Sequence, residues 1–271
     1  MNGLLCYAAE DVSRNRWFIR QLCSLAESEG ISLRLCLAED GFPSGEKPCL
    51  LINRSRNAEI SAYCEDVLKI PVYNSAAVTR ITNDKYRTHC FLRQHGIPTA
   101  DTLCCQPGVP LPAVQYPAVA KPADGHGGAG VAWIADAAAL RDYARQTGRP
   151  FLLQQPMITG WDMRVYVMGG RIYAAILRTS EADFRSNYSL GGTVRAVTPD
   201  AAAAALVQRV QEVLPMDFAG VDLLRHPEGG YVVGEIEDAA GCRMLYAETA
   251  LDPAADFIRM IAKLARKGCS R

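Results

Sequence analysis

The chain has 271 residues, of which 49% are hydrophobic, so it is long enough to bury a core in two or three structural units. Its 29 lysines and arginines balance 29 aspartates and glutamates, which argues against a nucleic-acid partner. No signal peptide or apolar run of transmembrane length is visible, and the ten cysteines include no Cys-x-x-Cys pair. We therefore expect a cytoplasmic protein with free thiols and no membrane partner.

The first predicted unit alternates strands with helices. We expect buried strands at 3–7, 31–37 and 50–53, a helix at 11–29, and a helical stretch that ends near Leu68. This alternation predicts a parallel sheet with right-handed crossovers. Residues 1–80 are therefore interpreted as an N-terminal α/β domain.

The second predicted unit covers residues 81–158. Asn83 is the expected cap of a helix that runs through 85–95 to Gly96. After it, the pattern predicts two strands, a short amphipathic helix and a third strand, at 97–105, 117–123, 136–148 and 150–155.

The third predicted unit covers residues 159–271. Long strands are expected within 163–179, with a hairpin at Gly169 and Gly170. An alanine-rich helix, a hairpin-like strand pair and a final helix follow at 200–214, 220–237 and 253–267. The whole chain is thus predicted to combine α/β and α+β units.

A lysine followed by a glycine-rich loop stands in the second unit. Lys121 ends an apolar strand and opens KPADGHGGAGV, which contains Gly125, Gly127 and Gly128. Glycines allow a backbone to fold closely over phosphates, and a half-buried lysine favours an anion beside it. The loop matches neither the Walker pattern nor the dinucleotide-binding pattern. A plain glycine-rich turn with a surface lysine is the alternative.

Carboxylates gather on the last predicted strand pair. Glu235 and Glu237 alternate with Ile236 and share one strand face, and Asp222 lies on the preceding strand. Like charges on facing strands repel, and a bound divalent cation would remove that cost. Hard oxygen ligands favour magnesium, with manganese as the second candidate ion. The alternative is a solvated strand face.

Cations and a linker complete the set of candidate residues. Arginines are suited to bidentate capture of carboxylate or phosphate oxygens, and the candidates are Arg164, Arg178 and Arg185, with Asn187 beside the last. The linker after strand 150–155 could bond adenine through the Gln155 carbonyl and the Met157 N–H. Exposed arginines and a plain hinge are the alternatives.

The order of these dissimilar segments resembles the ATP-grasp superfamily and, within it, the RimK-like ligases that add amino acids to a carboxylate. The resemblance covers roughly residues 50–245 and is carried by NDKYRTHCFLRQHGIPTADT, VAKPADGHGGAGV, WDMRVYVMGGRIYAAILR, DFRSN, GGTVRAVTP and AGVDLLR. It implies an ATP-grasp fold, in which two lobes enclose the nucleotide behind an N-terminal parallel-sheet domain.

The resemblance also implies roles for individual residues. Lys85 and Lys121 would contact the nucleotide phosphates under the loop at 125–130. Gln155 and Met157 would hold adenine, with Asp162 in the shell on the nucleotide side. Arg185 and Asn187 would lie near the γ-phosphate and the acyl phosphate, and Asp222 and Glu235 would ligate the metal.

The chain departs from the family pattern at three places. Glu237 stands where the family usually has an asparagine, and Ser180 stands where many relatives have a lysine. The stretch DAAGCRML lacks the small-Pro-Gly segment that the ligases use near the acceptor. We expect this divergent end to form the substrate pocket, with Arg243 and nearby Arg164, although Arg243 as a surface residue is an equal alternative.

The activity implied by the resemblance is ATP-dependent joining of a carboxylate and an amine through an acyl phosphate, with small-molecule or peptide substrates. A small-molecule kinase of the same fold and a nucleotide-binding regulator without turnover are the alternatives. A homo-oligomer is left open.

Overall fold

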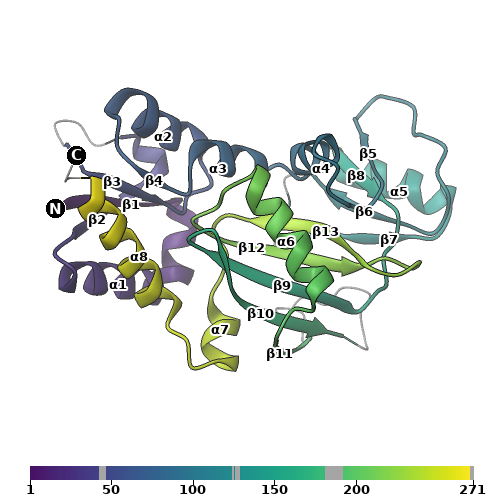
Figure 1. Cartoon of the computed structure of the whole chain (residues 1–271). Coiled ribbons are helices and arrows are strands. Elements are labelled where there is room, and N and C mark those ends of the chain that lie inside the picture. The colour runs from purple at the N-terminus through teal and green to yellow at the C-terminus, as the bar shows by residue number, and fades with distance from the viewer. Residues whose placement is uncertain (43–46, 124, 126–128, 181–191, 269–271) are drawn as a thin grey trace.

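The computed structural model describes residues 1–42, 47–123, 125, 129–180 and 192–268, and these residues form three sheets (Figure 1). None of the described helices is both long and apolar enough to cross a membrane.

The N-terminal sheet is parallel, as predicted, with strand order β2-β1-β3-β4. Its strands are β1 (Asn2–Tyr7), β2 (Ser32–Leu37), β3 (Leu50–Asn53) and β4 (Val72–Tyr73). Helix α1 (Ala9–Ser28) follows β1, and the 3-10 turn η1 (Ala38–Asp40) follows β2. Helix α2 (Ala58–Tyr63) continues into the π-helical turn η2 (Cys64–Leu68), so the predicted helical stretch to Leu68 is confirmed.

The connection to the second unit differs from the prediction. Helix α3 (Ala76–Thr82) was not expected, and Asn83 ends it. The next helix, α4 (Lys85–Gln94), is capped by Asp84, whose carboxylate accepts from the backbone N–H of Arg87. The predicted cap at Asn83 is therefore wrong. Both residue types cap helices well. The side chain of Asn83 instead donates to Asp238, which is 155 positions later in the sequence.

The small lobe is an antiparallel sheet with strand order β5-β8-β6-β7. Its strands are β5 (Thr102–Cys105), β6 (Ala118–Pro122), β7 (Ala132–Ile134) and β8 (Phe151–Gln154). Helix α5 (Ala137–Thr147) packs on this sheet through Leu140, which is 2% exposed. Apart from β7, these elements were predicted.

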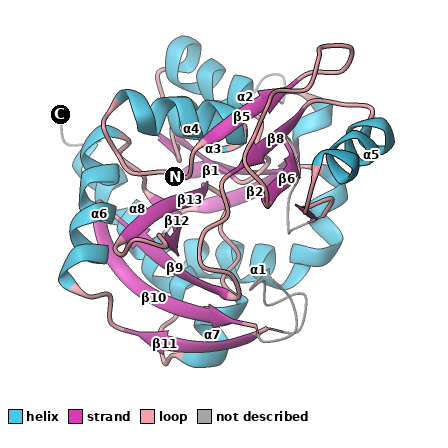
Figure 2. Ribbon diagram, turned by 90° about the vertical axis from the view of Figure 1, so that its right-hand side faces the viewer, coloured by secondary structure: helices cyan, strands magenta, loops and turns pink. Residues whose placement is uncertain are grey.

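The large sheet is antiparallel, with strand order β11-β10-β9-β12-β13. Its strands are β9 (Trp161–Met168), β10 (Arg171–Thr179), β11 (Thr193–Val197), β12 (Phe218–Arg225) and β13 (Tyr231–Glu237). Helix α6 (Ala201–Val213) covers one face through Leu206, Val207 and Val210. Figure 2 shows α6 on one side of this sheet and strands β5, β6 and β8 on the other. The part of the opposite face that carries Arg164, Arg178 and Asp222 therefore looks toward the small lobe.

The N-terminal sheet and the large sheet share one hydrophobic core. Helix α7 (Arg243–Glu248) leads into α8 (Pro253–Gly268), which packs against α1 at the opposite end of the sequence (Figure 1). Phe218 of β12 contacts Phe257 of α8, with ring centroids 5.2 Å apart. The buried amide of Asn74 adds a polar link: it donates to the carbonyls of Phe218 and Asp238. These contacts attach the large sheet to the N-terminal domain.

Candidate functional site

A cleft of about 190 Å³ lies between the small lobe and the polar face of the large sheet. The predicted residues that line it are Lys85, Lys121, Gly125, Gln155, Met157, Asp162, Arg164, Arg178, Asp222, Glu235 and Glu237. Four further predicted residues, Gly127, Gly128, Arg185 and Asn187, lie outside the described part of the chain. The structure thus brings together candidates that are up to about 150 positions apart in the sequence, such as Lys85 and Glu235.

The register of the large sheet explains why the charged residues meet. Asp222 on β12 is paired with Arg164 on β9 and with Glu235 on β13, so these residues form one row across three strands. Glu237 lies two positions beyond Glu235 and thus on the same face. The other face carries the apolar residues that pack under α6. Alternation along each strand therefore separates the charged face from the core.

A β-bulge adjusts this row. The pairing of β12 with β13 shifts between Asp222 and Leu223, which leaves Gly234 as the extra residue of β13. A Cβ atom at Gly234 would lie 2.8 Å from two side-chain carbons of Leu224. A larger residue there would have to displace the Leu224 side chain.

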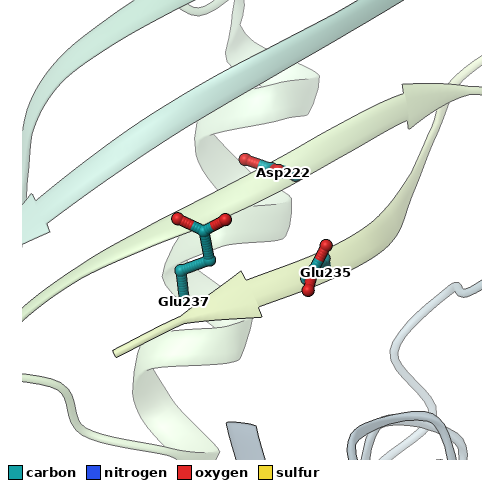
Figure 3. Close-up of side chains that lie close together, drawn as sticks. All are labelled: Asp222, Glu235 and Glu237. Atoms are coloured by element: carbon teal, nitrogen blue, oxygen red, sulfur yellow. The ribbon is translucent and has the colours of Figure 1, made fainter. Parts of the chain in front are cut away.

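The three predicted carboxylates form one cluster (Figure 3). Asp222 projects from β12, and Glu235 and Glu237 project from β13 toward the same side. One oxygen from each lies within 4.8 Å of the others. A set of carboxylate oxygens at this spacing fits a hard divalent cation such as magnesium or manganese.

Arg164 holds two members of this cluster. Its guanidinium donates to both oxygens of Asp222, at 2.7 Å each, and to both oxygens of Glu237, at 2.6 and 2.8 Å. Arg178 donates to Asp162 and, at 2.7 Å, to Asp222. Burial alone would raise the pKa of Asp222, but Arg164 and Arg178 outweigh burial and lower it. Asp222 is therefore a carboxylate at neutral pH.

Glu237 is in a different electrostatic position. Its side chain is 32% exposed, whereas that of its partner Arg164 is 8% exposed. Burial of the carboxylate raises its pKa, Arg164 opposes this shift, and the nearby Asp222 and Glu235 reinforce it. A cation beside Glu237 would stabilise its ionised form.

The two lysines line the cleft close to the carboxylate cluster. Lys85, at the first turn of α4, forms an ion pair with Glu235, although the two residues are 150 positions apart in the sequence. Lys121 is the last residue but one of β6, and burial lowers its pKa to about 8, with Lys85 adding to the shift and Glu235 opposing it. A lysine in such a position gains from an anionic ligand.

Apolar side chains line another part of the cleft. Val119, Ile158 and Leu224 line it together with the linker after β8. The backbone N–H of Gln155 donates to the Asp101 carbonyl, whereas within the described chain the Gln155 carbonyl and the Met157 N–H have no hydrogen-bond partner. This is the donor and acceptor pair expected for adenine. Sequence reasoning missed Trp161, which also lines the cleft and lies under Arg225, 4.5 Å from the ring centroid.

A second cavity of about 640 Å³ lies between the N-terminal domain and the end of β13. Arg164, Glu235 and Glu237 line both this cavity and the cleft described above. Arg243, expected in a substrate pocket, lies in this cavity's wall, together with Arg54, which sequence reasoning missed. Arg54 directly follows β3 at the carboxyl edge of the parallel sheet, where ligands of such sheets usually bind, so its position was a readable signal.

The chain is similar to known proteins in both sequence and structure. The model of the RimK-like ATP-grasp domain family matches residues 82–261. The probable alpha-L-glutamate ligase of Sodalis glossinidius is 33% identical over 70% of this chain and 68% of its own length. An uncharacterized protein of Mycoplasma pneumoniae, the MG011 homolog, is 27% identical over 96% of this chain and 91% of its own. The D-alanine–D-alanine ligase of Bacillus anthracis superposes with a TM-score of 0.75 at 15% identity, covering 99% of both chains, and this likeness confirms the predicted fold.

Proposed function

This chain belongs to the RimK-like ATP-grasp family, and from that membership we infer that it is an ATP-dependent ligase that joins a carboxylate to an amine. The observation that carries the inference is the cleft itself. It combines a lysine with a lowered pKa, three carboxylates suited to a divalent cation and two buried arginines. Such a site suits phosphoryl transfer, in which positioning and charge stabilisation supply most of the catalysis.

We propose that the nucleotide lies across this cleft. Lys85 and Lys121 bind its phosphates beneath the glycine-rich loop, and the Gln155 carbonyl and Met157 N–H bond adenine at the apolar end. Asp162 and Arg178 support the sheet face below. Asp222, Glu235 and Glu237 would hold magnesium or manganese, which when bound neutralises charge on the phosphate oxygens.

The proposed reaction has two steps. A carboxylate oxygen of the acceptor attacks the γ-phosphorus of ATP, and ADP leaves. The amine nitrogen then attacks the acyl carbon, phosphate leaves and the nitrogen loses a proton. Arg164 faces the junction of the two cavities and would hold the acyl phosphate there. Arg185 and Asn187 are proposed to assist at the γ-phosphate.

The second cavity is the proposed acceptor site because it meets the nucleotide cleft at Arg164, Glu235 and Glu237. Several expectations from the sequence stay predictions: the divisions 1–80, 81–158 and 159–271, a small-molecule or peptide acceptor, a cytoplasmic location and a possible homo-oligomer.

The test is ADP release from a panel of amino acids and short peptides. We expect release to require a carboxylate and an amine together, and Lys121→Ala to abolish it. Lys263→Ala, an exposed lysine on α8, is the matched control and should leave it unchanged. A phosphorylated product formed without an amine would instead indicate a kinase. ATP binding without turnover in any mixture would indicate a regulator.

A further inference from the structure

Two cysteines face each other on neighbouring strands of the N-terminal sheet. Cys6 on β1 and Cys36 on β2 are register partners, and no other strand pairing among the described residues joins two cysteines. Both are free thiols and belong to the apolar cluster under α2 and η2, on the sheet face away from α1. The Cys36 thiol donates to the Leu5 carbonyl at 3.8 Å, so it is turned toward β1.

The spacing of these strands fits a disulfide after a small movement. Neighbouring strands lie about 4.8 Å apart, and the Cα atoms of a disulfide lie about 4.4–6.8 Å apart. The side chains of register partners run side by side, so their Cβ atoms are separated by about the strand spacing, whereas a disulfide needs about 3.8 Å. Strand β2 is at the edge of the described sheet and can move toward β1. Strain left in such a bond makes it easier to reduce.

The pair combines reactivity with access. Cys6 is fully buried, whereas Cys36 is half-buried. The hydrogen bond from Cys36 lowers the pKa of the Cys6 thiol and outweighs burial, which raises it; the same bond raises the pKa of Cys36. The thiolate is the form that attacks oxidants. Cys6 is therefore the nucleophile of the pair, and Cys36 is the proton donor and marks the side from which a small oxidant enters.

The other cysteines nearby are less suited to pair with Cys6. Cys64 lies in η2 rather than on a strand, and burial raises its pKa to about 11, with Cys6 adding to the shift. Cys23, on α1, packs against the core on the opposite face of the sheet, and Cys49 is exposed. Only Cys36 thus combines register, a shared face and partial exposure with contact to Cys6 among the described cysteines.

We propose that Cys6 and Cys36 are a reversible oxidation site that closes to a disulfide when hydrogen peroxide enters beside Cys36. The Cys6 sulfur attacks one peroxide oxygen, the O–O bond breaks, and the leaving hydroxide takes the Cys36 proton and departs as water. The Cys36 sulfur then attacks the Cys6 sulfenic acid, the S–O bond breaks, and the hydroxide leaves as a second water with a solvent proton. The two sulfurs lose two electrons, which the peroxide accepts. A dithiol reductant reverses the bond by thiol–disulfide exchange.

The test is a peptide map of the full-length protein. Hydrogen peroxide is added until the exposed Cys49 is oxidised, and the remaining thiols are alkylated in denaturant. Cleavage after glutamate gives peptides 1–10 and 30–39, each with one of the two cysteines. We expect these peptides to be linked in the wild-type protein and released by dithiothreitol. Cys36→Ser should abolish the link, whereas Cys23→Ser, which removes a half-buried cysteine from the opposite face, is the matched control and should keep it.

Peptides that stay unlinked at this dose would overturn the proposal, as would a link from Cys6 to Cys64 or a link that dithiothreitol does not release. If Cys36→Ser does not fold, as judged by its melting curve, Cys36→Ala decides, since it keeps an apolar side chain at the edge strand. The map needs no turnover, so failure of the proposed ligase activity would leave its result unchanged.

Discussion

At the scale of single residues, the charged side chains of the cleft form ion pairs with one another. A bound nucleotide and metal ion would replace these ion pairs with contacts to the ligands. Glu235 pairs with Lys85, and Arg164 pairs with both Asp222 and Glu237. Each carboxylate suited to a metal therefore already has a cationic partner. These pairs keep the charges balanced in the absence of ligands, and binding replaces one set of contacts with another.

Glu237 offers a direct test of whether a metal ion replaces the ion pairs of the cleft. A third carboxylate should strengthen the hold on a cation, so Glu237→Gln and Glu237→Asn should raise the magnesium or manganese concentration needed for ATP binding, by about tenfold. The measurement is ATP binding across a metal titration, with Asp222→Asn and Glu235→Gln expected to remove metal dependence. If the curves of both Glu237 variants overlay the parent, Glu237 serves only as a partner of Arg164.

Lys121 predicts a pH dependence. Its pKa of about 8 means that the charged form, the one proposed to bind phosphate, is fully populated well below pH 8 and is lost as the pH rises through 8. ATP affinity should therefore fall above pH 8, by up to about tenfold per pH unit until the pKa of the complex is reached. Calorimetry at several pH values measures this fall. Lys121→Arg keeps its charge throughout and should flatten the curve, and an equal fall in both proteins would exclude Lys121 as the cause.

At the scale of elements, the register between β12 and β13 decides whether the carboxylates meet. The bulge at Gly234 lets Glu235 face Asp222 while Val233 pairs with Leu223. A strand without this extra residue would place its side chains on the opposite face from that point on.

Gly234→Ala should therefore damage both stability and metal binding. The new methyl group would lie 2.8 Å from Leu224, and the forced shift should cost about 1–3 kcal/mol of unfolding free energy. Denaturant unfolding measures the stability, and a metal titration measures the site. Gly241→Ala is the matched control, because a Cβ there meets nothing within 4 Å. Equal stability of both variants would mean that Leu224 moves freely and the bulge is not fixed by packing.

At the scale of the whole molecule, the N-terminal domain and the large sheet form one body whose junction contains the second cavity. Asn74 is central to this junction. Its side chain donates to two carbonyls and accepts from the N–H groups of Asp217 and Phe218, at 2.6 and 3.1 Å. The carbonyl of Asp238, one of its partners, directly follows Glu237. The junction thus holds the end of β13 in place.

Asn74→Ala should weaken this junction. Loss of the amide leaves buried backbone groups without partners, and we expect about 2–4 kcal/mol lower unfolding free energy. Asn57→Ala is the comparison: it removes the cap of α2 within the N-terminal domain and should cost about 1 kcal/mol. Chemical denaturation of both variants measures the difference. A smaller loss at Asn74 than at Asn57 would show that apolar contacts alone hold the junction.

Local patterns were sufficient for most elements. Period-two alternation placed the large strands, and the apolar spacing at 11–29 placed α1, because burial on one face leaves a readable period in the sequence. The short β7, β11 and α7 carried too few residues for a period to emerge. Two adjacent capping residues, Asn83 and Asp84, could not be ranked without knowing that Asn83 reaches Asp238.

The sequence by itself determined the fold class, the family and the residue types of the candidate cleft, since the lysines, glycines and carboxylates stand in a recognisable order in successive segments of the chain. Only the tertiary structure decided which of them are partners: Lys85 with Glu235, and Arg164 with Glu237. It alone placed Arg54, from the N-terminal domain, beside Arg243 in one cavity. Such contacts depend on sheet register and domain packing between residues far apart in the chain, and no local periodicity records them.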